Sequence, residues 1–240
     1  MDRKSGYTLE DIRACRPLVM GPAEVLFNRR LSTLLTALLV RTPLSPNQVT
    51  FLSFLVILPA IYLLSTGERT SLIAAGLLIQ LSFTLDCCDG EMARLRGHSS
   101  PFGAWLDGTL DRIAEVMLFV ALGLALERQT GDPRAWLYTL VSFSGLAMTH
   151  IVTLMTVNAF GKGKLEESRG LGIIGRLAGL LRISPRTMRN FLRSGIDVYL
   201  MVFTLGAVFN QLMWIVYYFA VVQNLYWLGI LLLVLARRGR

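Results

Sequence analysis

Six apolar segments, each 20 to 25 residues long, limit what this chain can fold into more than any other feature. They lie near residues 47–66, 71–93, 102–126, 135–159, 190–210 and 213–236. A helix needs about 20 residues to cross the roughly 30 Å hydrocarbon core of a bilayer. Apolar blocks of that length, in place of short alternating runs, indicate membrane-spanning helices. We therefore predict an all-α polytopic membrane protein with six transmembrane helices.

The composition supports this interpretation. Of the 240 residues, 53% are hydrophobic and only 17% are charged, whereas a soluble domain has about 25% charged residues. The net charge of +8 lies mostly between the apolar segments. We attribute it to membrane topology and expect no nucleic-acid partner. The three cysteines, Cys15, Cys87 and Cys88, form neither a CxxC pair nor a disulfide framework.

A charged but periodic segment precedes the first predicted span. Between Pro22 and Arg41 the chain reads PAEVLFNRRLSTLLTALLVR, with apolar residues at helical spacing around Arg29 and Arg30. It is too charged to cross a bilayer, so we predict an amphipathic helix that lies in the membrane interface. We expect residues 1–46 to form an N-terminal segment with this juxtamembrane helix, and the rest of the chain to form the six-helix domain, residues 47–240.

The distribution of basic residues orients the predicted spans. With the N-terminus in the cytoplasm, 20 of the 24 Lys and Arg residues fall on the cytoplasmic side. Three fall on the other side, Arg69, Arg128 and Arg134, and Arg112 lies inside the third span. Cytoplasmic loops of membrane proteins carry an excess of Lys and Arg. We therefore predict an integral membrane protein with both termini in the cytoplasm.

Four aspartates stand where the second and third predicted spans approach the cytoplasmic side. Asp86 and Asp89 are three residues apart, and Asp107 and Asp111 are four apart, so each pair shares one face of its helix. A single aspartate there would most simply be a helix cap or the partner of a nearby arginine. Four at these spacings on neighbouring antiparallel helices favour one common site with a cytoplasmic opening.

Such a site would need a cation. Four carboxylates close together repel one another and do not all ionise without a counter-charge. Oxygen ligands without Cys or His suit Mg²⁺, Mn²⁺ or Ca²⁺, and two such ions are the usual clamp for phosphoryl transfer. Gly90, Ala93 and Gly103 share the acidic faces and leave room for a ligand, and Arg94 is placed to contact a phosphate.

The spacing from Asp86 to Asp111, D-x2-D-G-x2-A-R-x8-G-x3-D-x3-D, resembles the signature of the CDP-alcohol phosphotransferases at every position. The six-span layout, the helix before the first span and the SPNQVT entry to that span also resemble this family. The resemblance implies transfer of a substituted phosphate from a CDP-linked alcohol to a second alcohol, with release of CMP. It also implies a homodimer whose active sites lie in polar cavities open to the cytoplasm.

The resemblance assigns roles to particular residues. It implies that Asp86, Asp89 and Asp107 hold divalent metal, two ions of Mg²⁺ or Mn²⁺ per site. It implies that Asp111 completes the second metal site and is the general base that activates the acceptor hydroxyl. The residues implied to line the CDP pocket are Asp89, Gly90, Ala93, Arg94, Gly103 and Asp107.

The substrates are less constrained. The stretches FNRRLSTLL, LSPNQVT and SPFGAWLDGTLDR resemble the subgroup that forms inositol phosphodiesters, which favours CDP-inositol with an inositol phosphate as acceptor. A phospholipid synthase that uses CDP-diacylglycerol is the alternative. Arg186, Arg189 and Arg193 lie at roughly helical spacing and are candidates for binding an acceptor phosphate, or else ordinary topological charge. An ion transporter is a third possibility, which the absence of repeated halves and the position of the acids disfavour.

Overall fold

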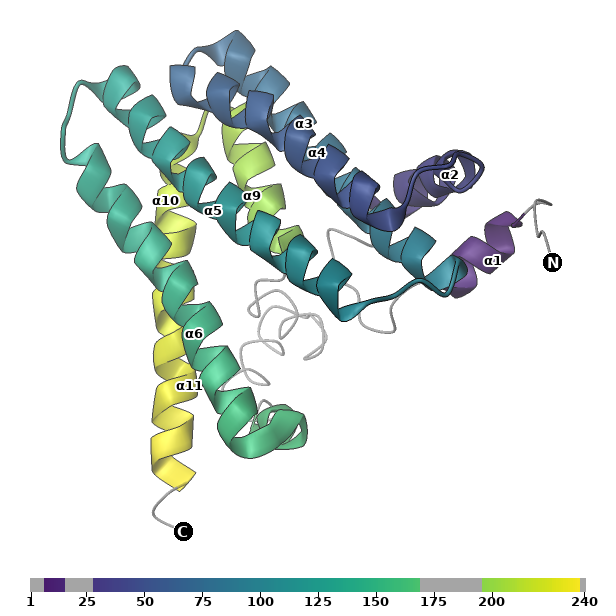
Figure 1. Ribbon diagram of the computed structural model, residues 1–240. Helices are drawn as coiled ribbons and strands as arrows, with labels where there is room; N and C mark the ends of the chain where they lie inside the picture. The colour runs from purple at the N-terminus through teal and green to yellow at the C-terminus, as the bar shows by residue number, and fades with distance from the viewer. Residues whose placement is uncertain (1–6, 16–27, 169–195, 238–240) are drawn as a thin grey trace, which may run out of the picture.

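The computed structural model describes residues 7–15, 28–168 and 196–237, and all the regular secondary structure in these ranges is helical. The all-α prediction is therefore confirmed. In chain order the elements are α1 (Leu9–Ala14), α2 (Arg29–Leu39), α3 (Pro46–Thr66), α4 (Arg69–Leu95), α5 (Pro101–Thr130), α6 (Ala135–Ser168), α9 (Ile196–Val208), α10 (Leu212–Tyr217), the π-helical segment η2 (Tyr218–Gln223) and α11 (Asn224–Arg237) (Figure 1).

Four helical stretches in the described part of the chain are long and apolar enough to cross a membrane. They are Pro46–Thr66, Arg69–Leu95, Ala135–Phe160 and Leu212–Leu232. The other two predicted spans correspond to α5, whose first half carries charged residues, and to α9, which has 13 residues. The helices α3 to α6 begin within two residues of the predicted spans, but α6 continues nine residues beyond the predicted end.

Local signals fix where the helices around the acidic residues begin and end. Ser45 caps α3 through a reciprocal pair of hydrogen bonds with Gln48, and Ser100 caps α5 by accepting a hydrogen bond from the N–H of Gly103 at 3.0 Å. Each cap is followed by a proline in the first turn, where its missing N–H costs nothing. Gly97 adopts a left-handed φ of +64° after α4. The short turn between α4 and α5 therefore reverses the chain.

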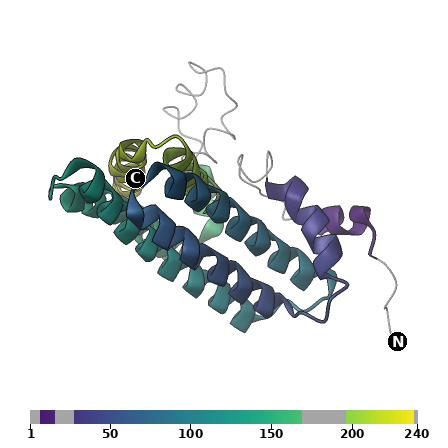
Figure 2. The ribbon, with the colours of Figure 1, turned by 90° about the horizontal axis from the view of Figure 1, so that it is seen from above.

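The long helices α3, α4 and α5 run side by side, and α2 lies beside the end of α4 (Figures 1 and 2). α3 packs closely against both α4 and α5, whereas α4 and α5 have few contacts with each other. On the far side, α6 pairs with η2 and α11. The aromatic rings of Phe119, Phe203 and Phe219 join α5, α9 and η2, with centroids 5.0 to 5.7 Å apart. The fold therefore leaves a gap between the C-terminal half of α4 and the N-terminal half of α5.

The helix α2 has an unusual distribution of polar and apolar residues. Four of its polar residues face inward: Arg29, Ser32, Thr33 and Thr36 are all at most 5% exposed, whereas Arg30 is exposed. Three of its leucines face outward: Leu31, Leu34 and Leu38 are between 48% and 63% exposed. Leu35 and Leu39 instead pack against the buried Val49, Cys88 and Met92. Of the helix predicted over residues 22–41, the structure describes the part from residue 28 onward. In that part the apolar stripe formed by Leu31, Leu34 and Leu38 is turned away from the protein.

Candidate active site

The structure brings the two aspartate pairs together across the gap between α4 and α5. One carboxylate oxygen from each of Asp86, Asp89 and Asp107 lies within 4.8 Å of the others. Asp89 is 7% exposed, while Asp86 and Asp107 are partly exposed. Spacing alone predicted that the pairs would face each other, and the packing of α3 against both helices brings them to this distance.

Asp111 lies one helical turn further along α5, on the side of this cluster that is farther from the turn between α4 and α5. We call this the inner side of the cluster, and the side nearer that turn the outer side. It lines a small cavity of about 30 Å³ together with Asp86 and Asp107. Polar groups from three other helices also line it: Thr50 and Ser53 of α3, Ser82 of α4 and Tyr199 of α9. A cavity of this size holds a water molecule or a small ion. The position of Asp111 thus suits a group that acts next to the metal cluster.

A second cavity of about 180 Å³ lies on the outer side of the cluster. Its lining includes all six residues implied to contact CDP, namely Asp89, Gly90, Ala93, Arg94, Gly103 and Asp107. Asp107 lines both cavities, so the two adjoin at the acidic cluster. The structure therefore gathers the predicted nucleotide residues around one space, next to the predicted metal ligands.

Two glycines lie where the lining is tightest. A Cβ on Gly103 would lie 2.9 Å from the side-chain oxygen of Asn47, and a Cβ on Gly90 would lie 3.2 Å from a guanidinium nitrogen of Arg94. Real Cβ atoms rarely approach other heavy atoms so closely, so each side chain would have to move. The glycines let the start of α3 and the arginine of α4 close around the cavity.

The donor set fits a divalent cation. Oδ2 of Asp89 is buried and has no hydrogen-bond partner among the described residues, and a buried acceptor without a partner is costly. Three carboxylate oxygens within 4.8 Å, with no sulfur or imidazole ligand among them, match the preference of Mg²⁺ and Mn²⁺ for oxygen. Asp86, Asp89 and Asp107 could therefore hold such an ion, with Asp111 beside them.

Several residues of the site were missed from the sequence. Asn47 and Thr50 at the start of α3, and Ser99 and Ser100 in the turn before α5, line the outer cavity. Tyr199 of α9, which is 2% exposed, lines the inner one. The SPNQVT stretch contains Asn47 and Thr50, so its resemblance to the family was the one sequence signal for these lining residues. Nothing in the local sequence connects α9 to the aspartates.

The acidic stripe of α5 also continues further than predicted. Glu115, four residues after Asp111, is 3% exposed. Its carboxylate lies 2.5 Å from a guanidinium nitrogen of Arg112 and 3.8 Å from Nδ1 of His150 on α6. Arg112 also contacts the ring of His150. The continuing i, i+4 spacing from Gly103 was the sequence signal for this extra carboxylate.

The arginines predicted to contact phosphate groups are only partly covered by the structure. Arg94 lines the outer cavity and donates a hydrogen bond through Nε to the carbonyl oxygen of Cys15, at the end of α1. Arg186, Arg189 and Arg193 lie outside the described residues. Their proposed contact with an acceptor phosphate stays a prediction.

Comparisons with known proteins agree with the geometry. The family model of the CDP-alcohol phosphatidyltransferases matches residues 43–235. A bifunctional IPC transferase and DIPP synthase of Rubrobacter xylanophilus is 36% identical over 186 residues, which are 72% of this chain and 42% of the relative. An archaetidylinositol phosphate synthase of Pyrococcus horikoshii is 38% identical over 82 residues (33% and 42%). A phosphatidylinositol phosphate synthase of Corynebacterium glutamicum is 37% identical over 99 residues (41% and 44%). The chain spans less than half the length of these three relatives.

Proposed function

Because the chain belongs to the CDP-alcohol phosphatidyltransferase family, we propose that it transfers a substituted phosphate from a CDP-alcohol to an acceptor alcohol. The products are a phosphodiester and CMP. One observation carries the proposal: six nucleotide-side residues line a cavity that shares Asp107 with the cavity of the base candidate, Asp111. This arrangement, together with the family, favours group transfer over ion transport.

The residues of the chain divide the work of the reaction. Gly90 and Gly103 admit the nucleotide to the helix backbones, and the guanidinium over Gly90 contacts a phosphate of the donor. Asp86, Asp89 and Asp107 hold the metal, and Asp111 completes the second site. Divalent cations, when bound, supply the charge that neutralises the pyrophosphate.

Asp111 is the proposed general base. Its carboxylate takes the proton of the acceptor hydroxyl as that oxygen forms a bond to the donor phosphorus. The bond from this phosphorus to the CMP oxygen breaks, and CMP leaves with the electron pair. The inner cavity places Asp111 next to Asp86 and Asp107, so a hydroxyl held there lies beside the donor phosphate.

We propose an inositol phosphate as the acceptor. The names of the three relatives refer to IPC, DIPP, archaetidylinositol phosphate and phosphatidylinositol phosphate. For the donor we propose CDP-inositol. A lipid donor such as CDP-diacylglycerol is the second candidate, because a largely apolar cavity of about 350 Å³ lies between α2, α4 and α9. Its lining includes Leu31, Met201 and Phe209, which suit a hydrocarbon chain.

The arrangement in the membrane is part of the same proposal. α5 and α9 join the four long apolar helices as transmembrane spans, with both termini and the aspartates at the cytoplasmic side. The outward-facing leucines of α2 support a location in the membrane interface. The protein works as a homodimer, and Arg186, Arg189 and Arg193 bind the phosphate of the acceptor.

The test is release of CMP by the purified protein with Mg²⁺ or Mn²⁺. CDP-inositol and CDP-diacylglycerol are supplied in parallel, each with inositol and with inositol phosphate. We expect turnover of at least one donor and a loss of about 10²-fold or more in Asp111→Asn. The matched control, Asp132→Asn, changes an acid in the turn between α5 and α6 and should keep full activity. Failure to turn over any CDP-alcohol contradicts the proposal, and a purely lipid product contradicts its CDP-inositol version.

A further inference from the structure

The last two turns of α4 carry two kinds of carboxylate on opposite faces. Asp89 faces the cavity on the side of α5. Glu91 follows two residues later, about 200° further around the helix, and is completely buried. It belongs to none of the predicted metal or nucleotide residues. A fully buried carboxylate is costly unless it is paired and hydrogen-bonded, so its surroundings must explain it.

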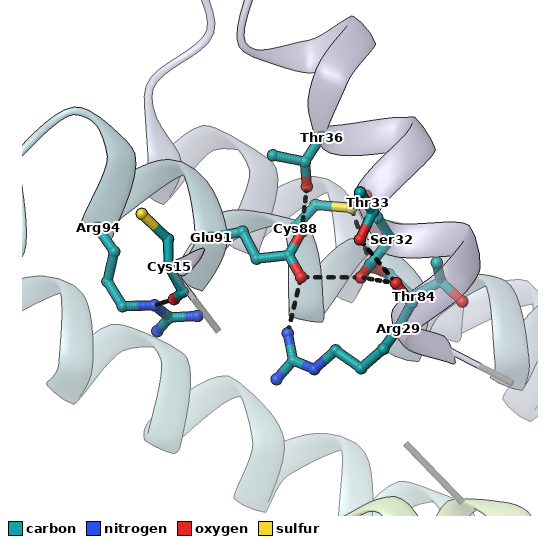
Figure 3. A network of polar contacts seen from close by, with 9 residues as sticks. All are labelled: Cys15, Arg29, Ser32, Thr33, Thr36, Thr84, Cys88, Glu91 and Arg94. Atoms are coloured by element: carbon teal, nitrogen blue, oxygen red, sulfur yellow. Dashed lines mark hydrogen bonds and ion pairs between the residues drawn. The ribbon is translucent and has the colours of Figure 1, made fainter. Parts of the chain in front are cut away.

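Among the residues that the structure describes, the hydrogen-bond donors to Glu91 all come from α2 (Figure 3). Oε1 accepts hydrogen bonds from Nη1 of Arg29 at 2.9 Å and from the hydroxyl of Ser32 at 3.0 Å. Oε2 accepts one from the hydroxyl of Thr36 at 2.7 Å. Positions 29, 32 and 36 lie on one face of a helix. The inward polar face of α2 is thus complementary to this one carboxylate.

Further contacts tie the end of α4 to the same N-terminal region. Nη2 of Arg96 donates hydrogen bonds to the carbonyl oxygens of Val40 and Thr42, at 2.9 and 3.0 Å, just after α2 ends. The carbonyl oxygen of Leu95 accepts a hydrogen bond from the hydroxyl of Tyr7 at 3.2 Å. Arg94, whose guanidinium lies over Gly90, contacts the end of α1 as described above. The segment of α4 that lines the outer cavity is therefore bound on its other side.

These contacts with the N-terminal region matter because the opposite face of α4, toward α5, has little support. α4 and α5 have few contacts with each other, since the cavity lies between them. The position of Asp89, Gly90 and Arg94 therefore depends on α3 and on the N-terminal helices. The helix α9 also packs against α4, with hydrogen bonds from Thr204 to Gly76 and from Gln80 to Thr204, nearer the start of α4. Groups that hold metal ligands in place typically change metal affinity or activity by about 10–100-fold when they are mutated.

We propose that α2 holds the donor-side end of α4 in position, and that Glu91 is the positioning residue that joins the two helices. Through Arg29, Ser32 and Thr36, Glu91 sets the affinity for metal and for the CDP-alcohol without contacting either ligand. The effect on the CDP-alcohol rests on the proposed function. The mechanical coupling between α2 and α4 does not.

The first experiment measures the coupling itself, by hydrogen exchange and mass spectrometry of the full chain in detergent. Glu91→Gln keeps the shape of the side chain but removes the charge that pairs with Arg29. We expect amides of residues 86–96 to exchange about tenfold faster, with residues 69–80 unchanged, and Mn²⁺ binding to weaken by about tenfold or more. Ser32→Ala and Thr36→Val each remove one hydrogen bond, so they should give smaller changes in the same direction. They replace Glu91→Gln in the test if that variant fails to fold.

Two controls separate positioning from general damage. Arg30→Gln removes the exposed charge next to Arg29 on the same turn and should leave exchange in residues 86–96 unchanged. Gln129→Ala removes hydrogen bonds to Gly67 and Asn210, at the opposite end of the helices, and should lower thermal stability without changing Mn²⁺ binding. Unchanged exchange in Glu91→Gln, or an equal change in Arg30→Gln, overturns the proposal.

The second experiment is kinetic. In Glu91→Gln the KM for the CDP-alcohol and the apparent constant for Mg²⁺ should rise about tenfold, while the KM for the acceptor stays within about twofold. The double variant Arg29→Met with Glu91→Met should recover both values toward wild type, because an apolar pair can replace a buried ion pair. A loss of kcat with unchanged donor KM contradicts the proposal that α2 positions the donor-side end of α4. If the wild type turns over no CDP-alcohol but the exchange result holds, the proposed function fails and the coupling stands.

Discussion

Replacement of Gly103 by alanine adds a single methyl group at the tightest point of the outer cavity. The new Cβ would lie 2.9 Å from the side-chain oxygen of Asn47 and 3.2 Å from the hydroxyl oxygen of Ser100. Ser100 caps α5, so the group that can yield is the amide of Asn47. We expect that amide to turn away from α5 and change the shape of the space that we assign to the nucleotide.

Two opposing contributions set the change in the free energy of unfolding of Gly103→Ala. Alanine favours a helix over glycine by about 0.5–1 kcal/mol, whereas overpacking costs about 1–3 kcal/mol. The net loss of stability is therefore at most about 2.5 kcal/mol, which lowers the thermal midpoint by no more than about 10 °C in a chain of this size. Asn47 lines the outer cavity, and a hydrogen bond from its amide to a bound donor would be worth about 1.5 kcal/mol. Loss of that bond would raise the KM about tenfold.

The assay compares Gly103→Ala with Gly108→Ala in the same helix. A Cβ on Gly108 meets no described atom within 4 Å, so this control gains helix stability and keeps its donor KM. We expect a KM for the CDP-alcohol about tenfold higher in Gly103→Ala, with the acceptor KM unchanged. Equal donor KM values in the two variants would refute the assignment of the outer cavity to the donor.

Three further predictions concern other contacts. Asp89→Asn should abolish Mn²⁺ binding in calorimetry and raise the thermal midpoint of EDTA-treated protein, because it removes a buried charge with an unpartnered oxygen; a lower midpoint would contradict this. Gly90→Ala should raise the donor KM severalfold, since its Cβ would lie 3.2 Å from a nitrogen of Arg94; Gly108→Ala, whose Cβ meets no described atom within 4 Å, should not. Gly145→Ala should cost about 1–3 kcal/mol, visible as a lower thermal midpoint, because its Cβ would lie 2.8 Å from the carbonyl oxygen of Phe219; an unchanged midpoint would show that α6 and η2 separate freely.

The helices and the acidic faces could be predicted from local patterns. A transmembrane helix satisfies its own backbone and needs only an apolar run of sufficient length, so the starts of α3 to α6 fell within two residues of their predicted positions. Spacings of three and four residues then placed the aspartates of each pair on one face. The fourth predicted span ends one residue before the apolar stretch of α6, Ala135–Phe160, although the helix itself continues into GKGKLEES.

Contacts between distant parts of the chain were decided by the tertiary structure. Glu91 and its partners on α2 are separated by 55 to 62 positions, and Tyr199 joins the inner cavity from a helix beyond α6. Helical periodicity states which residues share a face, but not which other helix that face will meet. The sequence alone therefore determined that four carboxylates share two faces, while helix packing determined which groups hold them in place.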